Sequence, residues 1–505
     1  MAEKLIVYSD QTRGRIAPEV YGHFIEHLGH FIYDGIWVGR DSKIPNIDGI
    51  REEAVAVLRS VSAPLIRWPG GFFADCYDWR DGVGPQENRP VRYLEHQDGD
   101  IEPNAFGTHE FMRLCELTGA EPNLCVNTAT LTAQDAMDWV EYCNGEAESA
   151  ITGLRRENGR KEPWKVNYWA IGNEAYWRHR PQDYVQRYLL WRKYMLRVDK
   201  DLRIIASLIE PTWRPEPFSP HEDCLQEVVC GIRGNMEMAS LHLYSEGGSG
   251  GEFTVDEYWD LLAQVDQRNR LRIESLLGVI DAVVGDQRIS LALDEWGIWH
   301  PEGWKTKSLE QPCTHRDAIF AARYFHLLQS YPRRIALATI AQSVNVLHAL
   351  LRTDGADSYR TPTYHVFEMF KGHQGGEALE CLHTRPRREI RSAATRMRKD
   401  ALMDLVTVSA SKSQQSGKML ITLTNADPEE TFAYDVELVG RFTAISASAR
   451  VLAAEPQDAN TFTEPDRVQA RNLAVDLSEN RVRVRLPPCS VTALAVKGRG
   501  AKDLP

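Results

Sequence analysis

The sequence contains neither a long apolar run nor a paired cysteine motif. No segment approaches about 18 uninterrupted apolar residues, so we expect no membrane-spanning helix and no membrane partner. The segment Met1–Asp10 has no apolar signal-peptide core, so we expect no export. The nine cysteines include no C-x-x-C pair, which argues against a disulfide framework or a zinc ribbon. We therefore expect the protein to reside in the reducing cytoplasm.

Basic charge is also scarce. The 71 acidic residues outnumber the 59 basic ones, and the net charge at pH 7 is −12. Because no long basic run offsets this balance, we expect no nucleic-acid partner and favour an uncharged substrate. The 505 residues are 43% hydrophobic and 26% charged, as in a soluble globular protein that exceeds one ordinary domain. One large and one smaller domain are expected.

Apolar, β-prone runs recur along roughly the first three quarters of the chain, and helical patterns lie between them. One helix is expected to begin at Thr132, with Asp135 three residues on in the manner of a capping box. Eight strands alternating with helices predict a (β/α)8 TIM barrel over residues 15–375. The expected strands are 20–25, 63–68, 121–126, 166–171, 203–209, 238–244, 289–293 and 335–341. The other expected helices begin at Asp48 or span 182–198, 256–284, 314–330 and 362–371.

The pattern changes after residue 375, where short alternating runs replace helical periodicity. They predict an antiparallel, jelly-roll-like β-sandwich. The orphan strand 4–9, followed by a turn-rich break at Asp10–Arg15, is expected to pair with that sandwich. The second domain would then comprise 1–14 plus 376–505. The runs are 404–410, 418–424, 433–438, 443–452, 481–486 and 490–496.

Two glutamates, Glu174 and Glu295, each close an apolar run that should be a buried strand. A buried carboxylate is costly unless it is paired or used in chemistry. In a barrel, residues at the carboxyl ends of the strands meet at one mouth. Glycoside hydrolysis needs one carboxylic acid and one carboxylate, so the pair predicts a glycosidase that needs no metal and no cofactor. The polar residues expected at this mouth are Glu26, Asn127, Glu174, Tyr244, Glu295 and Gln342.

Several longer motifs accompany these glutamates. They are Tyr21–Gly29, Arg67–Gly71, Tyr77–Trp79, Asp81–Pro85, Asn104–Phe111, Gly172–Glu174, Asp294–Trp296 and Ala341–Val346. Together they span nearly the whole chain, which resembles the α-L-arabinofuranosidases of glycoside hydrolase family 51.

The resemblance implies a retaining, exo-acting enzyme that removes terminal arabinofuranosyl groups from arabinan, arabinoxylan or derived oligosaccharides. It implies Glu174 as acid/base and Glu295 as nucleophile, and it suggests a homo-oligomer such as a hexamer. The residues that match the family's sugar-hydroxyl and nucleophile contacts are Glu26, Asn173, Tyr244 and Gln342. Packing is the alternative for Tyr244, and a salt bridge to Arg67 is the alternative for Glu26.

The chain departs from the family's usual pattern at three places. Phe72 stands where relatives commonly have Asn or Cys. We expect its ring to point into the mouth, where it narrows the pocket or removes a hydrogen bond to the sugar. The alternative is that the ring turns outward and packs under a loop. Gly297 replaces a usual Asn, and a basic loop, Ala175–Arg180, follows Glu174. Another specificity within the family, such as endoglucanase or xylosidase, is therefore the alternative.

Tryptophan and histidine side chains allow alternative interpretations of the site. Trp68, Trp79 and Trp299 are each either sugar platforms or core aromatics. A metal-dependent barrel hydrolase is a weaker alternative, because the segment around His23 and His27 does not follow the H-E-x-x-H pattern. Its candidate ligands are His23, His27, His30 and His242. A carbohydrate-binding protein with an inactive barrel is disfavoured because both carboxylates are present.

Overall fold

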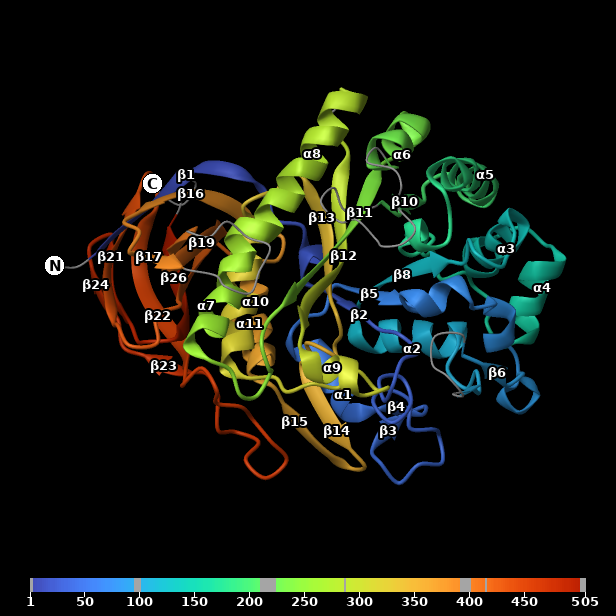
Figure 1. Ribbon diagram of the computed structural model, residues 1–505, viewed down its shortest axis with the longest axis horizontal. Coiled ribbons are helices and arrows are strands. Elements are labelled where there is room, and N and C mark those ends of the chain that lie inside the picture. Colours follow the sequence, from blue (N-terminus) through green and yellow to red (C-terminus); the bar gives the residue numbers. More distant parts are fainter. Residues whose placement is uncertain are drawn as a thin grey trace.

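The computed structural model describes residues 3–94, 101–208, 224–285, 288–390, 401–413 and 416–499. Within these residues eight parallel strands close into a barrel (Figure 1). Their order around the barrel confirms the predicted (β/α)8 fold. The strands are β2 (Gly22–Phe24), β5 (Leu65–Trp68), β8 (Glu121–Val126), β9 (Tyr168–Ile171), β10 (Arg203–Ala206), β11 (Met238–Glu246), β12 (Ser290–Trp299) and β13 (Ile335–Ile340).

Helices surround the barrel and connect its strands (Figure 1). The capping box predicted at Thr132 is present, because Thr132 Oγ1 accepts a hydrogen bond from the Asp135 amide and Asp135 Oδ2 accepts one from the Thr132 amide. The helices are α1 (Glu52–Ser60), α2 (Thr108–Thr118), α3 (Ala133–Asn144), α4 (Ala150–Glu157), α5 (Pro181–Val198), α6 (Cys224–Ile232), α7 (Val255–Gln264), α8 (Arg270–Val284), α9 (Pro301–Lys305), α10 (His315–Gln329) and α11 (Pro362–Phe370). Among the described helices, none combines the length and the apolar character needed to cross a bilayer.

Some predicted boundaries shift. The run 20–25 begins as a 3-10 turn, η1 (Pro18–Tyr21), and the helix expected from Asp48 starts at Glu52, after the hairpin of β3 (Asn46–Ile47) and β4 (Ile50–Arg51). The run 203–209 ends at a residue outside the described ranges. β11 and β12 continue beyond the predicted ends because they stay paired as far as Glu246 and Trp299. The carboxylate of Glu295 therefore projects from within a strand.

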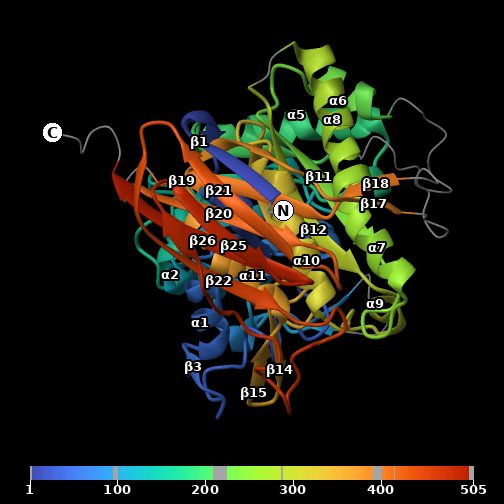
Figure 2. The same ribbon diagram turned by 90° about the vertical axis from the view of Figure 1, so that its left-hand side faces the viewer.

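The C-terminal region forms a ten-stranded sheet in which β1 (Glu3–Arg15) takes part (Figure 2). β1 pairs antiparallel with β16 (Glu377–His383) and parallel with β21 (Phe432–Val439), so the predicted placement of the N-terminal strand is confirmed. The predicted break at Asp10–Arg15 is wrong, because register shifts after Tyr8 and Thr12 absorb these residues as bulges within the strand. The remaining strands are β19 (Val406–Lys412), β20 (Lys418–Asn425), β22 (Thr443–Ala453), β23 (Arg471–Leu473), β24 (Asp476–Ser478), β25 (Arg481–Leu486) and β26 (Ser490–Arg499).

This sheet curls so that β25 lies against β20 and β26, and its apolar side chains enclose a separate core. α10 lies between the sheet and the barrel (Figure 1). All of its side chains are buried. Outside the two main sheets, the loops contain short two-stranded hairpins. They are β3–β4, β6–β7 (Arg92–Tyr93 with Ile101–Glu102), β14–β15 (Leu351–Asp354 with Asp357–Arg360) and β17–β18 (Arg387–Ile390 with Ala401–Asp404).

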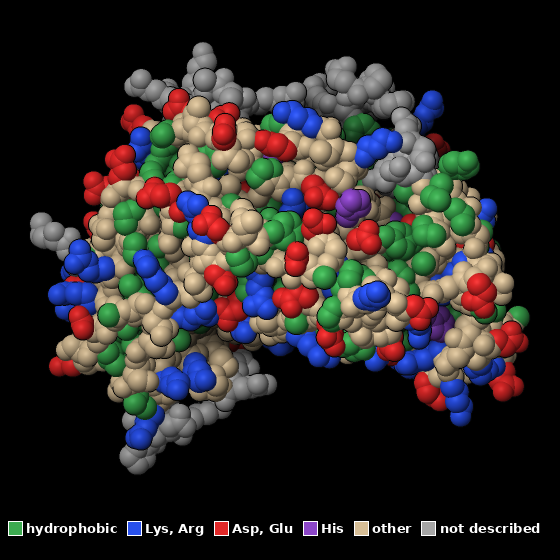
Figure 3. Space-filling model, turned by 90° about the horizontal axis from the view of Figure 1, so that it is seen from below, with side chains coloured by type: hydrophobic (Ala, Val, Ile, Leu, Met, Phe, Trp, Pro, Cys, Tyr) green, Lys and Arg blue, Asp and Glu red, His purple; other side chains and the backbone are tan. Residues whose placement is uncertain are grey.

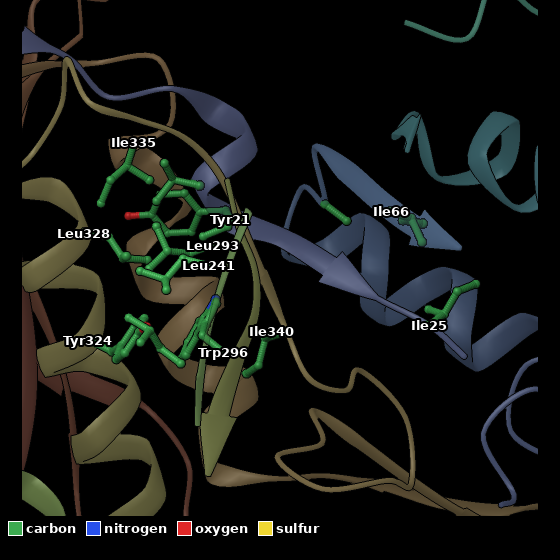
Figure 4. Close-up of a cluster of buried hydrophobic side chains, with 14 of the residues drawn as sticks. Tyr21, Ile25, Ile66, Leu241, Leu293, Trp296, Tyr324, Leu328, Ile335 and Ile340 are labelled. Atoms are coloured by element: carbon green, nitrogen blue, oxygen red, sulfur yellow. The ribbon is translucent and has the colours of Figure 1, made fainter. Parts of the chain in front are cut away.

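The outer face of β12 packs against α10, and this contact fixes which side chains β12 turns inward. Trp296 stacks on Tyr324 with the ring centroids 4.4 Å apart, and Leu293 lies in the same cluster (Figure 4). Since both Leu293 and Trp296 face outward, the two residues between them, Asp294 and Glu295, are left for the barrel interior. The loops that follow the strands all lie at the carboxyl end of the barrel, so side chains from every strand can meet there and a site is expected at that end.

Candidate active site

Glu174 follows β9 through a tight Gly172–Asn173 turn. Gly172 has a φ of +77°, and a Cβ there would lie 2.6 Å from Thr128 Oγ1, so no larger residue fits without movement. Glu174 itself has φ 39° and ψ 46°, a left-handed conformation that costs a non-glycine residue about 1 kcal/mol or more. Such strain is typical of side chains that a site holds in place for chemistry.

Glu295 reaches the same mouth through a β-bulge in β12. Ser240 pairs with Ala292 and His242 with Glu295, so two steps along β11 match three along β12. The extra residue turns Asp294 and Glu295 to one side, as bulges beside active sites commonly do. One carboxylate oxygen of Glu174, one of Glu295 and a ring nitrogen of His242 all lie within 4.8 Å of one another.

Two side chains donate hydrogen bonds to the carboxyl group of Glu295. Arg67 Nη1 donates to Glu295 Oε1 over 2.7 Å, and Tyr244 Oη donates to Glu295 Oε2 over 2.7 Å. Burial alone would lower the pKa of Arg67, but Asp294 and Glu295 raise it above its usual value. Burial and the neighbouring Glu295 raise the pKa of Tyr244 well above its ordinary value, so its hydroxyl stays a donor.

Arg67 also orients Asn173, whose Oδ1 accepts a hydrogen bond from Arg67 Nη2 over 2.6 Å. This contact commits the amide oxygen, so the Asn173 Nδ2 group is the part available as a donor to a ligand. Arg67 is fully buried. Its guanidinium contacts both Asn173, which precedes the candidate acid Glu174, and the candidate nucleophile Glu295.

His242 lies at the centre of the carboxylates. Its Nδ1 is 2.8 Å from Glu174 Oε1 and 3.5 Å from Glu295 Oε2, and its Nε2 is 3.4 Å from Asp294 Oδ1. Burial alone would lower the pKa of His242, but Glu295, Asp294 and Glu174 raise it to about 10. We therefore expect an imidazolium at neutral pH.

The same contacts set the state of Glu174. Burial acts to raise the pKa of Glu174, but hydrogen bonds from His242 and Trp177 outweigh it and the pKa is lowered. Trp177 Nε1 donates to Glu174 Oε2 over 3.0 Å, so both carboxylate oxygens are engaged. Glu174 and His242 thus form one unit that holds a proton between them.

Glu26 binds backbone amides after β5. Its Oε1 accepts hydrogen bonds from Gly71 N at 2.7 Å and Phe73 N at 3.2 Å, and its Oε2 accepts one from Gln342 Nε2 at 2.9 Å. Burial, and then the charge of Glu295, raise the pKa of Glu26 to about 7. Arg67 donates its hydrogen bonds to Glu295, Asn173 and the Asp294 carbonyl oxygen. The alternative salt bridge between Arg67 and Glu26 is therefore not formed, and Glu26 binds the backbone amides instead.

The other sequence candidates fall into different places. Asn127 bonds within its own loop, where its Oδ1 accepts from the Ala129 and Thr130 amides. Trp68 and Trp79 are almost fully buried and pack among other aromatics, which fits the core reading. Trp299 lies beside Tyr244 with the ring centroids 5.3 Å apart. Phe72 begins the 3-10 turn η2 (Phe72–Asp75) next to Gly71, with 42% of its surface exposed.

The histidines considered as metal ligands do not gather in one place. His27 uses Nδ1 with Glu102 and accepts a hydrogen bond from Trp68 at Nε2. His23 Nδ1 bonds Ser343 Oγ, and the exposed His30 lies near Glu310. Of these four histidines only His242 joins the two glutamates, where its neighbours are the carboxylates already described.

Sequence reasoning overlooked three parts of the site. Asp294 was visible in its motif, but only the bulge brings it within 2.6 Å of Ser240 Oγ and near His242. The hydrogen bond from Arg67 to Glu295 was not expected, because the sequence suggested a partner for Arg67 only in the alternative salt bridge to Glu26. Asp75 carried no sequence signal, yet it is buried, its pKa is raised to about 7 by burial, and it lies 3.7 Å from Arg178 in the loop that follows Glu174.

Comparison with known proteins bears on the family of the chain. Family models match residues 57–258, as the α-L-arabinofuranosidase 1 domain, and residues 294–490, as the α-L-arabinofuranosidase C-terminal domain. The chain is 35% identical to an intracellular exo-α-L-arabinofuranosidase of Bacteroides ovatus, over 98% of this chain and 95% of that protein. This chain belongs to the α-L-arabinofuranosidases of glycoside hydrolase family 51.

Solved structures place the whole chain of this family 51 member on the same fold. A family 51 arabinofuranosidase from Xanthomonas axonopodis pv. citri is 29% identical, with a TM-score of 0.89 over 98% of this chain and 100% of that one. The α-L-arabinofuranosidase from Thermotoga maritima, solved as an arabinose complex, is 27% identical, with a TM-score of 0.86 over the same shares. The predicted family resemblance is confirmed.

Proposed function

We propose that this family 51 enzyme is a retaining, exo-acting glycosidase that releases terminal α-L-arabinofuranosyl residues from arabinan, arabinoxylan or derived oligosaccharides. The observation that carries the proposal is the approach of Glu174 and Glu295 oxygens to within 4.8 Å. Retaining glycosidases hold their two carboxyls roughly 5 Å apart, whereas inverting ones need a wider gap for water. Acidic and basic side chains are mixed on the face shown in Figure 3.

In the first step Glu295 attacks the anomeric carbon and forms a glycosyl ester. The bond to the leaving oxygen breaks, and Glu174 supplies that oxygen with a proton. In the resting site the proton is held on His242 and passes over 2.8 Å to Glu174 as the leaving oxygen gains charge. In the second step Glu174 takes a proton from water, whose oxygen displaces Glu295 and regenerates the site.

We assign the sugar contacts to side chains that surround this pair. Asn173, Glu26 and Gln342 supply hydrogen bonds to hydroxyls, and the buried Gln342 Oε1 has no protein partner among the described residues. Tyr244 orients Glu295, and Trp299 provides an apolar wall beside Tyr244. We also assign Phe72, which follows Gly71 and is partly exposed, to the sugar contacts.

The proposal also covers the location, the oligomeric state and the domain division of the enzyme. We propose a cytoplasmic homo-oligomer, such as a hexamer, that acts on arabinose-containing oligosaccharides; the name of the Bacteroides ovatus relative, an intracellular enzyme, supports this location. We also propose that the chain divides into a catalytic domain, 15–375, and a sheet domain of 1–14 plus 376–505. The pairing of β1 with β16 and β21 supports this division.

Azide rescue of the two glutamate variants tests the function. Glu295→Ala should abolish turnover, because no glycosyl ester can form, and azide should yield a glycosyl azide of inverted configuration. Glu174→Ala should lose about 10²- to 10⁴-fold in kcat/KM on an oligosaccharide but keep the first step with an activated aryl substrate, where azide accelerates the second step. Glu380→Ala, a half-exposed position on β16, is the control.

Assays of the wild-type enzyme with a panel of aryl glycosides test which terminal sugar the enzyme releases. Hydrolysis of 4-nitrophenyl α-L-arabinofuranoside in preference to xylosides and glucosides is the expected result. If xylosides or cello-oligosaccharides are preferred, the specificity is wrong although the two-glutamate chemistry stands. If both glutamate variants keep more than a few per cent of oligosaccharide activity, the catalytic assignment itself fails.

A further inference from the structure

Trp304 is a large aromatic residue in an unusual position. It belongs to α9, which begins two residues after β12 ends, on the rim of the barrel mouth (Figure 1). Its side chain is 66% exposed, although indole is among the most costly surfaces to leave in water. α9 is only five residues long, and its first turn contains Pro301.

A row of rings connects Trp304 to the nucleophile. Trp304 stacks on Trp299 with centroids 4.2 Å apart and an interplanar angle of 12°. Trp299 meets Tyr244 edge to face at 5.3 Å, and Tyr244 bonds Glu295 over 2.7 Å. The row therefore begins at the reacting carboxylate and ends at the surface.

The segment around Trp304 is fixed by several contacts. Glu302 accepts hydrogen bonds from the Ser249 hydroxyl and the Gly250 amide in the loop after β11. Gly303 approaches Trp299 so closely that a Cβ there would lie 3.2 Å from the indole Nε1. One face of Trp304 is thus covered by Trp299, and the neighbouring residues Glu302 and Gly303 anchor the segment that carries it.

We propose that Trp304 is a specificity-determining residue that stacks on a sugar of the leaving group, outside the terminal arabinofuranosyl residue. This inference rests on the proposed function. In an exo-acting enzyme the terminal sugar occupies the closed end of the site, so a flat ring further out meets the rest of the oligosaccharide. The C–H face of a sugar packs well on an indole ring, and such contacts tolerate different linkages because they use no fixed hydrogen bond.

The test compares two substrates that share the terminal sugar. α-L-Arabinofuranosyl fluoride has no leaving-group sugar, whereas α-1,5-arabinotriose has two. Trp304→Ala should lower kcat/KM for the triose about 3- to 10-fold, the range expected for one aromatic contact, and should change the fluoride less than about 2-fold. Trp304→Phe keeps a ring and should retain at least about half of the triose activity.

Phe462→Ala, which removes another exposed aromatic side chain, is the matched control and should leave both substrates unchanged. Equal losses on the fluoride and the triose would overturn the proposal, since Trp304 would then only support Trp299. If Trp304→Ala leaves kcat/KM unchanged on both substrates, the proposal is overturned as well. This holds also if light scattering shows that the variant has an altered oligomeric state, because Trp304 would then belong to a subunit interface. If the wild-type enzyme cleaves neither substrate, the proposed function itself fails.

Discussion

Replacing His242 should change how activity depends on pH more than it changes activity at low pH. His242 and Glu174 share one proton across 2.8 Å, and the pair retains it until His242 titrates. His242→Gln removes the imidazolium and leaves Glu174 to hold the proton alone. The alkaline limb of kcat/KM, which reports loss of the catalytic proton, should therefore move to lower pH.

The direction of this change follows from the surroundings of the two groups. The pKa of His242 is raised to about 10 by the surrounding carboxylates. Glu26 shows what burial and Glu295 do to a carboxyl in this mouth, because its pKa is raised to about 7. In His242→Gln the alkaline limb should thus move to lower pH, and kcat/KM relative to wild type should fall further at about pH 8.5 than at about pH 6.

The assay is kcat/KM for an arabinofuranoside measured across the range in which the enzyme stays folded. Tyr244→Phe is the matched control, because it removes a hydrogen bond from Glu295 and leaves the Glu174–His242 pair intact. It should lower kcat/KM, because Glu295 loses an orienting contact, and leave the alkaline limb in place. An alkaline limb that stays the same in His242→Gln would refute the shared proton.

Two further predictions concern specificity and stability. Phe72→Asn should raise kcat/KM for 4-nitrophenyl α-L-arabinofuranoside, about tenfold if a hydrogen bond of about 1 kcal/mol is restored, with little change in melting temperature. An unchanged or lower kcat/KM in the folded variant would place the specificity determinant in the loop Tyr176–Arg180. His373 is buried between Ser411 and Thr422, and burial lowers its pKa to about 3. Its unfolded-state pKa is higher, near 6.5, so stability should be complete above about pH 6.5 and fall as the pH drops, by about 2 kcal/mol at pH 5. Melting curves against pH should show a shallower acid loss in His373→Asn, and equal slopes would contradict the assignment.

The sequence by itself determined the order of the elements. Apolar runs at 121–126 and 335–341 and the capping box at Thr132 are local signals, because strand and helix periods and N-caps depend on residues near one another. The same reasoning placed Glu174 and Glu295 at the carboxyl end of the barrel, since that end follows from the order of strands and helices alone. The motifs around them also indicated the family.

Only the tertiary structure decided how the carboxylates are held. The bulge in β12 depends on pairing with β11 and β13, and without it the alternation of the strand would have turned Asp294 away from Glu295. The charge on His242 likewise arises from three carboxylates that lie far apart from it in the chain or on the neighbouring strand. Such features depend on register and distance between strands, which no local pattern of residues fixes.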